Sequence, residues 1–167
     1  MNRVFLVGDN IDTDQLAPGQ YMRGGIEELA RHSLEAVRPD FASSVRPGDV
    51  LVGGENFGIG SSREQAAEAL RHLGVACVIA QSFAGIFYRN AINLGLPVLV
   101  GKDLSHVEDG DPCRFDIDAG ELALTAKNTT LRLEPLPENL KQMLSDGGLV
   151  PHLKKRFAAK RKDEARQ

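Results

Sequence analysis

The chain has 167 residues, 42% of them hydrophobic and 26% charged, with a formal net charge of −3, which is ordinary for a soluble protein. No apolar run approaches the roughly 18 residues of a membrane span, and no signal segment opens the chain. The two cysteines, Cys77 and Cys113, lie in an apolar run and at a turn exit, so they predict no disulfide framework. We therefore expect one cytoplasmic domain over residues 1–167.

The predicted elements alternate between strands and helices in the first two thirds of the chain. A strand at 3–7 (RVFLV) is followed by the most flexible loop, 17–25 (APGQYMRGG). Further short apolar runs bounded by Gly, Pro or Asp predict buried strands at 49–54, 76–82 and 96–101. Between these strands, 63–74 and 83–95 carry apolar residues at helical spacing and end in a glycine, so we expect two amphipathic helices.

The last third of the chain has a different pattern. CRFDID, ELALTA and TTLRLEP alternate apolar and polar residues around the short turns AG and KN, which predicts a β-meander. Two helices follow, at 137–148 and 149–162. Residues 154–167 hold seven of the 20 basic and two of the 23 acidic residues, which leaves +5 on this tail and −8 on the rest. Because Phe157 is the tail's one aromatic residue, we expect a solvated helix end that binds no nucleic acid.

The segment NFGIGSSRE (56–64) follows a predicted strand and opens a predicted helix. It is neither a P-loop nor a dinucleotide fingerprint, since no Gly-Lys-Ser/Thr follows and Arg63 stands where the third glycine belongs. Backbone N–H groups at a helix start, two hydroxyls and a guanidinium favour a small anion such as a carboxylate or phosphate. The alternative, that Ser62 only caps the helix, leaves Gly58, Gly60 and an unpaired Arg63 unexplained. We favour an anionic substrate.

A second polar cluster, GDNIDTDQLAPG (8–19), follows the first strand. Asn10, Asp12 and Asp14 have the spacing of a calcium loop, but the glycine and glutamate that such a loop needs are absent. The alternative is a strand exit with Asx turns. We expect at least one carboxylate to orient a group or exchange a proton. The four histidines lack metal-binding spacing, and we expect them at the surface: His32, His72, His106 and His152.

Three segments in this order resemble the small subunit of 3-isopropylmalate dehydratase, the swivel domain of the aconitase superfamily: GDNIDTD, VRPDFASSVRPGDVLVGGENFGIGSSRE and AQSFAGIFYRNAINLGLPVL. The resemblance covers residues 3–150. It implies an α/β fold, a swivelling β/β/α domain with a compact β-barrel-like sheet core and flanking helices. It also implies a hydro-lyase of leucine biosynthesis that removes and re-adds water on a hydroxy di- or tricarboxylate.

The resemblance also assigns roles to single residues. Ser61, Ser62 and Arg63 match the family's Ser-Ser-Arg motif, in which Ser61 supplies the alkoxide that removes a proton beside a carboxylate, while Ser62 and Arg63 bind that carboxylate. Because a free serine hydroxyl is too weak a base, it needs the surrounding donors to stabilise its oxyanion. Asp14 matches the aspartate of the family's TD motif, which pairs with a histidine of the large subunit near the leaving hydroxyl.

The family's four-iron four-sulfur cluster lies on a separate large subunit. The cysteine count agrees with this division, because two cysteines cannot supply the three ligands that a substrate-binding cluster needs. We therefore expect this chain to bind no metal and no cofactor. We expect it to be active only with the large subunit, and to contact no nucleic acid and no membrane.

One position departs from the isopropylmalate pattern. The loop after the TD motif carries the family's substrate-choosing residue, and here it reads YMRGG, with Arg23 near that position. An apolar residue suits an isopropyl group, whereas an arginine suits a further carboxylate, as in homoaconitase. Isopropylmalate remains the default substrate, with homoaconitase or another hydroxy-acid hydro-lyase as the alternative. A non-catalytic anion-binding or regulatory module is the alternative of another class, and the intact Ser-Ser-Arg motif and Asp14 weigh against it.

Overall fold

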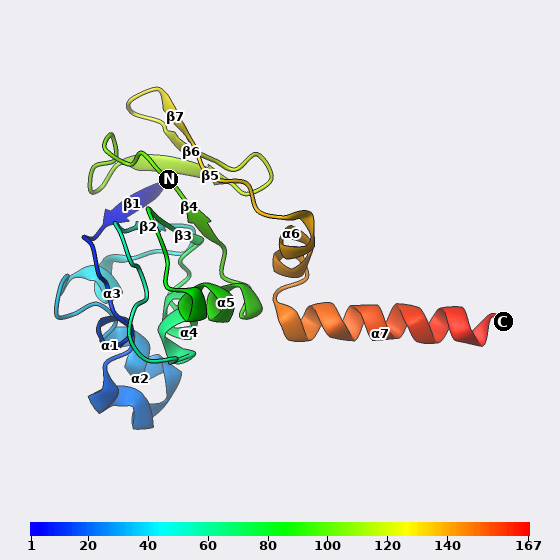
Figure 1. Cartoon of the computed structure of the whole chain (residues 1–167). Helices are drawn as coiled ribbons and strands as arrows, with labels where there is room; N and C mark the ends of the chain where they lie inside the picture. The colour runs from blue at the N-terminus through cyan, green and yellow to red at the C-terminus, as the bar shows by residue number, and fades with distance from the viewer.

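The computed structural model describes residues 1–167, which form one curved seven-stranded sheet with helices packed on one side (Figure 1). The strands are β1 (Asn2–Leu6), β2 (Val50–Val52), β3 (Cys77–Ala80), β4 (Val98–Val100), β5 (Pro112–Asp116), β6 (Glu121–Leu124) and β7 (Thr129–Arg132). The helices are α1 (Thr13–Leu16), α2 (Gly25–Arg31), α3 (Phe41–Ser44), α4 (Gln65–His72), α5 (Gly85–Asn93), α6 (Glu138–Ser145) and α7 (Leu149–Ala165), with a 3₁₀ helix, η1 (Gly19–Gly24). None of these helices has the length and apolar character needed to cross a membrane.

The strand order is β4-β3-β2-β1-β5-β6-β7. The first four strands in this order are parallel, and the remaining pairs, from β1–β5 to β6–β7, are antiparallel. Beyond the end of β7 the chain returns to the opposite edge of the sheet, where the Glu134 amide donates to the Val100 carbonyl at 2.8 Å. The sheet thus curls toward a barrel, and the predicted fold class is confirmed.

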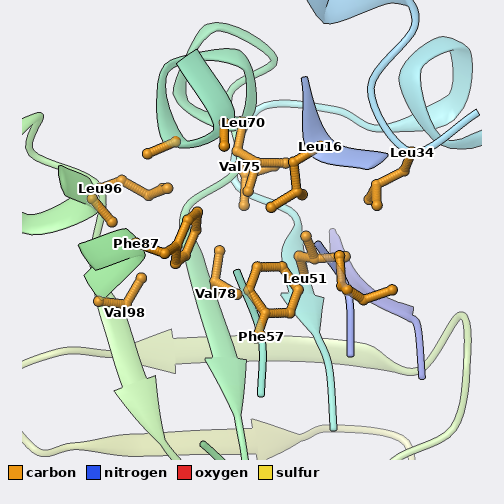
Figure 2. Packing of buried hydrophobic residues seen from close by; sticks show 14 of the residues in the cluster. Leu16, Leu34, Leu51, Phe57, Leu70, Val75, Val78, Phe87, Leu96 and Val98 are labelled. Carbon is orange, nitrogen blue, oxygen red and sulfur yellow. The ribbon is translucent and has the colours of Figure 1, made fainter. Parts of the chain in front are cut away.

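Successive residues of the parallel strands point into two different cores, as the period of a strand requires. On β2, Leu51 faces the helices, whereas Val50 and Val52 face the inside of the curl. Figure 2 shows the helix-side core, in which Leu51 lies in one cluster with Leu70 of α4 and Phe87 of α5. Because both faces are covered, β2, β3 and β4 are apolar throughout, which is why their sequences read as continuous hydrophobic runs.

The structure corrects the prediction of a flexible loop at 17–25. This segment contains the 3₁₀ helix η1 and the start of α2. Gly25 joins the two at a φ of +85°, a conformation that favours glycine. The glycine that suggested flexibility therefore marks a fixed junction between two short helical elements.

The C-terminal tail is helical, as predicted, and stands away from the body (Figure 1). Asp146, at the end of α6, holds the base of α7 by accepting from Lys155 Nζ at 3.0 Å and contacting His152 Nδ1 at 2.7 Å. All residues from Lys154 onward are exposed. The basic charge of the tail is therefore solvated along its whole length.

Candidate active site

Two loops lie side by side at the carboxyl ends of β1 and β2, the edge of a parallel sheet where ligands commonly bind. The Gly58 amide donates to the Ile11 carbonyl at 2.7 Å, and the Thr13 amide donates to the Ile59 carbonyl at 2.8 Å. These hydrogen bonds fix the register of segment 8–14 against segment 53–61. As a result, the TD pair lies beside the Ser-Ser-Arg motif although nearly 50 residues separate them in the chain.

Two glycines permit this close approach. Gly58 has a φ of +84°, and a Cβ atom there would lie 2.2 Å from the Phe87 ring. Gly60 has a φ of +108°, and its Cβ would lie 3.0 Å from Thr13 Oγ1. Neither position accepts a side chain without strain. The glycines of the motif therefore serve packing and loop shape.

Ser61 Oγ lies 3.2 Å from Thr13 Oγ1, and either hydroxyl can donate. Ser61 is exposed, whereas Thr13 is only 3% exposed and packs beneath it. The buried Thr13 hydroxyl therefore restrains the orientation of the exposed Ser61 hydroxyl. Sequence reasoning missed Thr13, although it stands next to Asp14 in the TD motif, because its contact with Ser61 depends on the pairing of two distant loops.

Arg63 forms an ion pair with Asp14, with 2.6 Å between Nη1 and Oδ1, and the same nitrogen donates to the Ala17 carbonyl at 3.1 Å. The expectation that Arg63 is unpaired is therefore wrong. Its side chain is 30% exposed, and no protein group accepts a hydrogen bond from Nε or Nη2. One edge of the guanidinium is thus fixed by the protein, and the other edge is free for a bidentate carboxylate.

The same ion pair determines the state of Asp14. The hydrogen bond from Arg63, reinforced by the Gly19 amide at 3.1 Å, holds the pKa of the Asp14 carboxyl below its usual value. Asp14 is therefore an exposed carboxylate whose observed contact is with Arg63. By contrast, Asp12 caps α1 by accepting from the Gln15 amide at 2.7 Å, so the Asx-turn alternative holds for this residue.

Ser62 is not the cap of α4. The helix starts at Gln65, its N-cap residue is Glu64, and no side chain makes a capping hydrogen bond. Ser62 is exposed and donates to no protein group, so the alternative that Ser62 only caps the helix is excluded. Ser62 is available to a ligand beside Ser61 and Arg63.

Arg23 is the one predicted site residue that the structure does not bring to the others. It lies exposed in the last turn of η1 and makes no hydrogen bond or ion pair. The other end of η1 does reach the site, because Gly19 contacts Asp14. A cavity of about 320 Å³ beside the site is lined by Asp14, Gln15, Pro18, Gly19, Gln20, Glu35 and Ala36.

The residues of this chain do not fit an iron–sulfur cluster. Cys77 and Cys113 are both buried inside the curl of the sheet. Burial raises the pKa of Cys77 well above its usual value and that of Cys113 to about 11, so neither is a ready thiolate. No group of three His, Cys, Asp or Glu side chains is arranged to hold a metal ion.

Comparison with known proteins identifies the family. The model of the aconitase C-terminal domain matches residues 30–102. The methanogen homoaconitase small subunit of Methanothermobacter thermautotrophicus is 50% identical over 151 residues, which cover 90% of this chain and 88% of that one. The 3-isopropylmalate dehydratase small subunit of Halothermothrix orenii is 47% identical over 154 residues, which cover 91% and 93%.

A solved structure agrees with these relatives. The crystal structure of 3-isopropylmalate dehydratase from Methanocaldococcus jannaschii is 44% identical, covers 97% of each chain and superposes with a TM-score of 0.92. Similarity of this extent covers the sheet, the flanking helices and the loops that carry the site. The chain therefore belongs to the family of small subunits of 3-isopropylmalate dehydratase-type hydro-lyases, within the aconitase superfamily, as its three motifs predicted.

Proposed function

We propose that this chain is the small subunit of a 3-isopropylmalate dehydratase, which interconverts 2- and 3-isopropylmalate by removing and re-adding water. The observation that carries the proposal is the pairing of the two loops, which places the Ser61 hydroxyl beside a guanidinium with one free edge. The relatives that are similar over nine tenths of the chain carry this name or that of a closely related hydro-lyase. Leucine biosynthesis, in the cytoplasm, is the corresponding setting.

The residues of this chain supply the proton-transfer half of the reaction. Ser61, as alkoxide, takes the proton from the carbon next to a substrate carboxylate, and the hydroxyl on the neighbouring carbon leaves. The free edge of Arg63 and the Ser62 hydroxyl bind that carboxylate and stabilise the negative charge that develops on it. Thr13 holds Ser61 in place from below, while Asp14 holds the guanidinium.

The exposure of the site supports a second wall supplied by a partner. Ser61, Ser62 and Asp14 all lie at the surface, whereas a base that removes a carbon-bound proton needs a site that excludes water. We propose that the large subunit provides this wall. Its four-iron four-sulfur cluster would supply the Lewis acid for the leaving hydroxyl.

Reconstitution with a large subunit tests the proposed function. The complex should hydrate isopropylmaleate and interconvert the two isopropylmalates, and each chain alone should not. In the same complex, Ser61→Ala should lower kcat by several orders of magnitude while co-purification with the large subunit is unchanged, because only the proton transfer is lost. A complex that turns over no hydroxy acid, or that retains its activity with Ser61→Ala, would contradict the proposal.

Arg23 favours a second candidate substrate, one with a further carboxylate in place of the isopropyl group, as in the homoaconitase relative. Arg23 has no partner in the protein, so its guanidinium is free for such a group. We predict that Arg23→Val shifts the ratio of kcat/KM toward 3-isopropylmalate by about 5- to 150-fold, the range expected for a charge-assisted hydrogen bond. Arg31→Val, an exposed arginine on α2, is the control, and the large subunit is held constant. An unchanged ratio would remove Arg23 from substrate recognition.

A further inference from the structure

The 3₁₀ helix η1 borders the site but contributes no buried residue to the core. At its start the Gly19 amide donates to Asp14 at 3.1 Å, so this end is tied to the catalytic loops. Pro18 precedes η1, and Gly25 follows it at a φ of +85°. The position of the segment therefore depends on a small number of side-chain contacts between these two boundaries.

The most specific of these contacts is a stacked aromatic pair. The ring of Tyr21 lies over the ring of His32, with 3.5 Å between the centroids and 7° between the planes. His32 ends α2 as its C-cap residue, so the pair joins η1 to the far end of the following helix. Met22 adds a partly buried contact with the helix-side core.

The His32 ring makes a second contact, at its edge, with Glu35. His32 Nδ1 lies 2.7 Å from Glu35 Oε2, within hydrogen-bond distance, which restrains rotation of the imidazole about its side-chain bonds. Glu35 also lines the cavity that Gly19 and Gln20 border. The contacts from Tyr21 to His32 and from His32 to Glu35 thus connect η1 to another residue that lines the same cavity.

We propose that Tyr21 and His32 are positioning residues for substrate preference: their stack fixes η1 and with it the backbone position of Arg23. The inference rests on the proposed function, because it assumes that a substrate occupies this site. When the backbone of η1 is already fixed, a substrate that binds Arg23 has to order only the arginine side chain and not the segment that carries it. Without the stack, η1 would remain attached through Gly19 and Met22, and its Arg23 end would be less restrained.

Trypsin cleavage after Arg23 tests the structural half of the inference without reference to activity. In the folded full chain, release of the fragment 1–23 reports how often η1 opens. His32→Ala should raise its initial rate by about 3- to 10-fold, the range that an aromatic contact supports. His32→Phe, which keeps the stacking but not the Glu35 contact, should remain within about twofold of the parent. His72→Ala, an exposed histidine in the last turn of α4, is the matched control.

Kinetics of the reconstituted complex test the functional half. His32→Ala and Tyr21→Leu should raise KM and change the ratio of kcat/KM between 3-isopropylmalate and a tricarboxylate analogue, with little change in kcat. His32→Phe should restore the parent ratio. Faster cleavage with an unchanged substrate ratio would show that the stack holds η1 but does not set preference. Cleavage of His32→Ala at the rate of the parent would overturn the inference outright, whereas an inactive parent complex would count only against the proposed function.

Discussion

Arg63 shows how a single guanidinium can be both fixed and available. Nη1 is held by Asp14 and by the Ala17 carbonyl, whereas Nε and Nη2 have no protein partner. An arginine free on all sides would lose the entropy of its long side chain each time it bound a ligand. In Arg63 much of this entropy is already lost on folding. The free edge still presents two parallel N–H groups, which match the two oxygens of a carboxylate.

The state of Asp14 follows from the same contact. Its pKa lies below the ordinary value of 3.8, so the ion pair is complete above that pH and is lost as the pH falls through the lowered pKa. We predict that an NMR titration of the Asp14 carboxyl carbon gives a midpoint below 3.8, and that Arg63→Gln moves the midpoint upward. Arg89→Gln, an exposed arginine on α5, should leave it in place. Equal midpoints in all three proteins would exclude the ion pair.

The proposed role of Thr13 rests on its hydrogen bond with Ser61, 3.2 Å between the two hydroxyl oxygens. Its buried hydroxyl is the one protein group that hydrogen-bonds the side chain of Ser61. Thr13→Val keeps the volume and removes the hydroxyl, and we predict a fall in kcat of about 5- to 150-fold with KM nearly unchanged. Thr13→Ser should recover most of the activity. If Thr13→Val had the parent kcat, Ser61 would need no such partner.

At the scale of elements, the glycine loop between β2 and α4 is the feature that assembles the site. Gly58→Ala places a Cβ atom 2.2 Å from Phe87 at a positive φ, so we predict a loss of about 2–4 kcal/mol in the free energy of unfolding. Gly8→Ala is the matched control, because a Cβ there meets nothing within 4 Å. Urea unfolding measures both variants. Equal stability of the two would mean that the loop can move away from α5.

The buried strands and the amphipathic helices were predictable from sequence, and the very short helices were not. β2 and β3 are continuous apolar runs, and α4 has apolar residues at helical spacing. Both patterns arise because these residues are buried in the core, and both can be recognised in the sequence. In contrast, α1 and α3 have four residues each, too few for a period, and η1 contains glycines that suggested a loop. Such elements exist because caps and tertiary contacts hold them, as with the reciprocal hydrogen bonds between Asp12 and Gln15.

The candidate site was likewise predictable from sequence only in part. Ser61, Ser62 and Arg63 were found because they are consecutive and lie where a glycine loop meets a helix. The partners Thr13 and Asp14 are 48 and 49 residues distant from Ser61 and Arg63, so the contacts that define their roles follow from strand order and loop register. No local pattern contains that information.

At the scale of the whole molecule, the proposed placement of the cluster on a large subunit leads to a prediction about iron. Both cysteines lie inside the curled sheet, where burial raises the pKa of each thiol. We predict that the chain, treated anaerobically with iron and sulfide and then desalted, shows no visible absorbance and no stoichiometric iron. The reconstituted complex, treated in the same way, should show both. Stoichiometric iron in the single chain would require cysteines that the folded domain does not present.

The narrow attachment of η1 has a consequence for how enzymes of this kind diverge. Relatives named for isopropylmalate and for homoaconitase chemistry are 47% and 50% identical to this chain, so overall similarity does not separate the two substrates. If preference resides in the segment between Pro18 and Gly25, a few exchanges there can redirect the enzyme while the proton-transfer apparatus and the sheet are inherited unchanged. Selection could then alter what the enzyme consumes without passing through an ancestor that fails to fold.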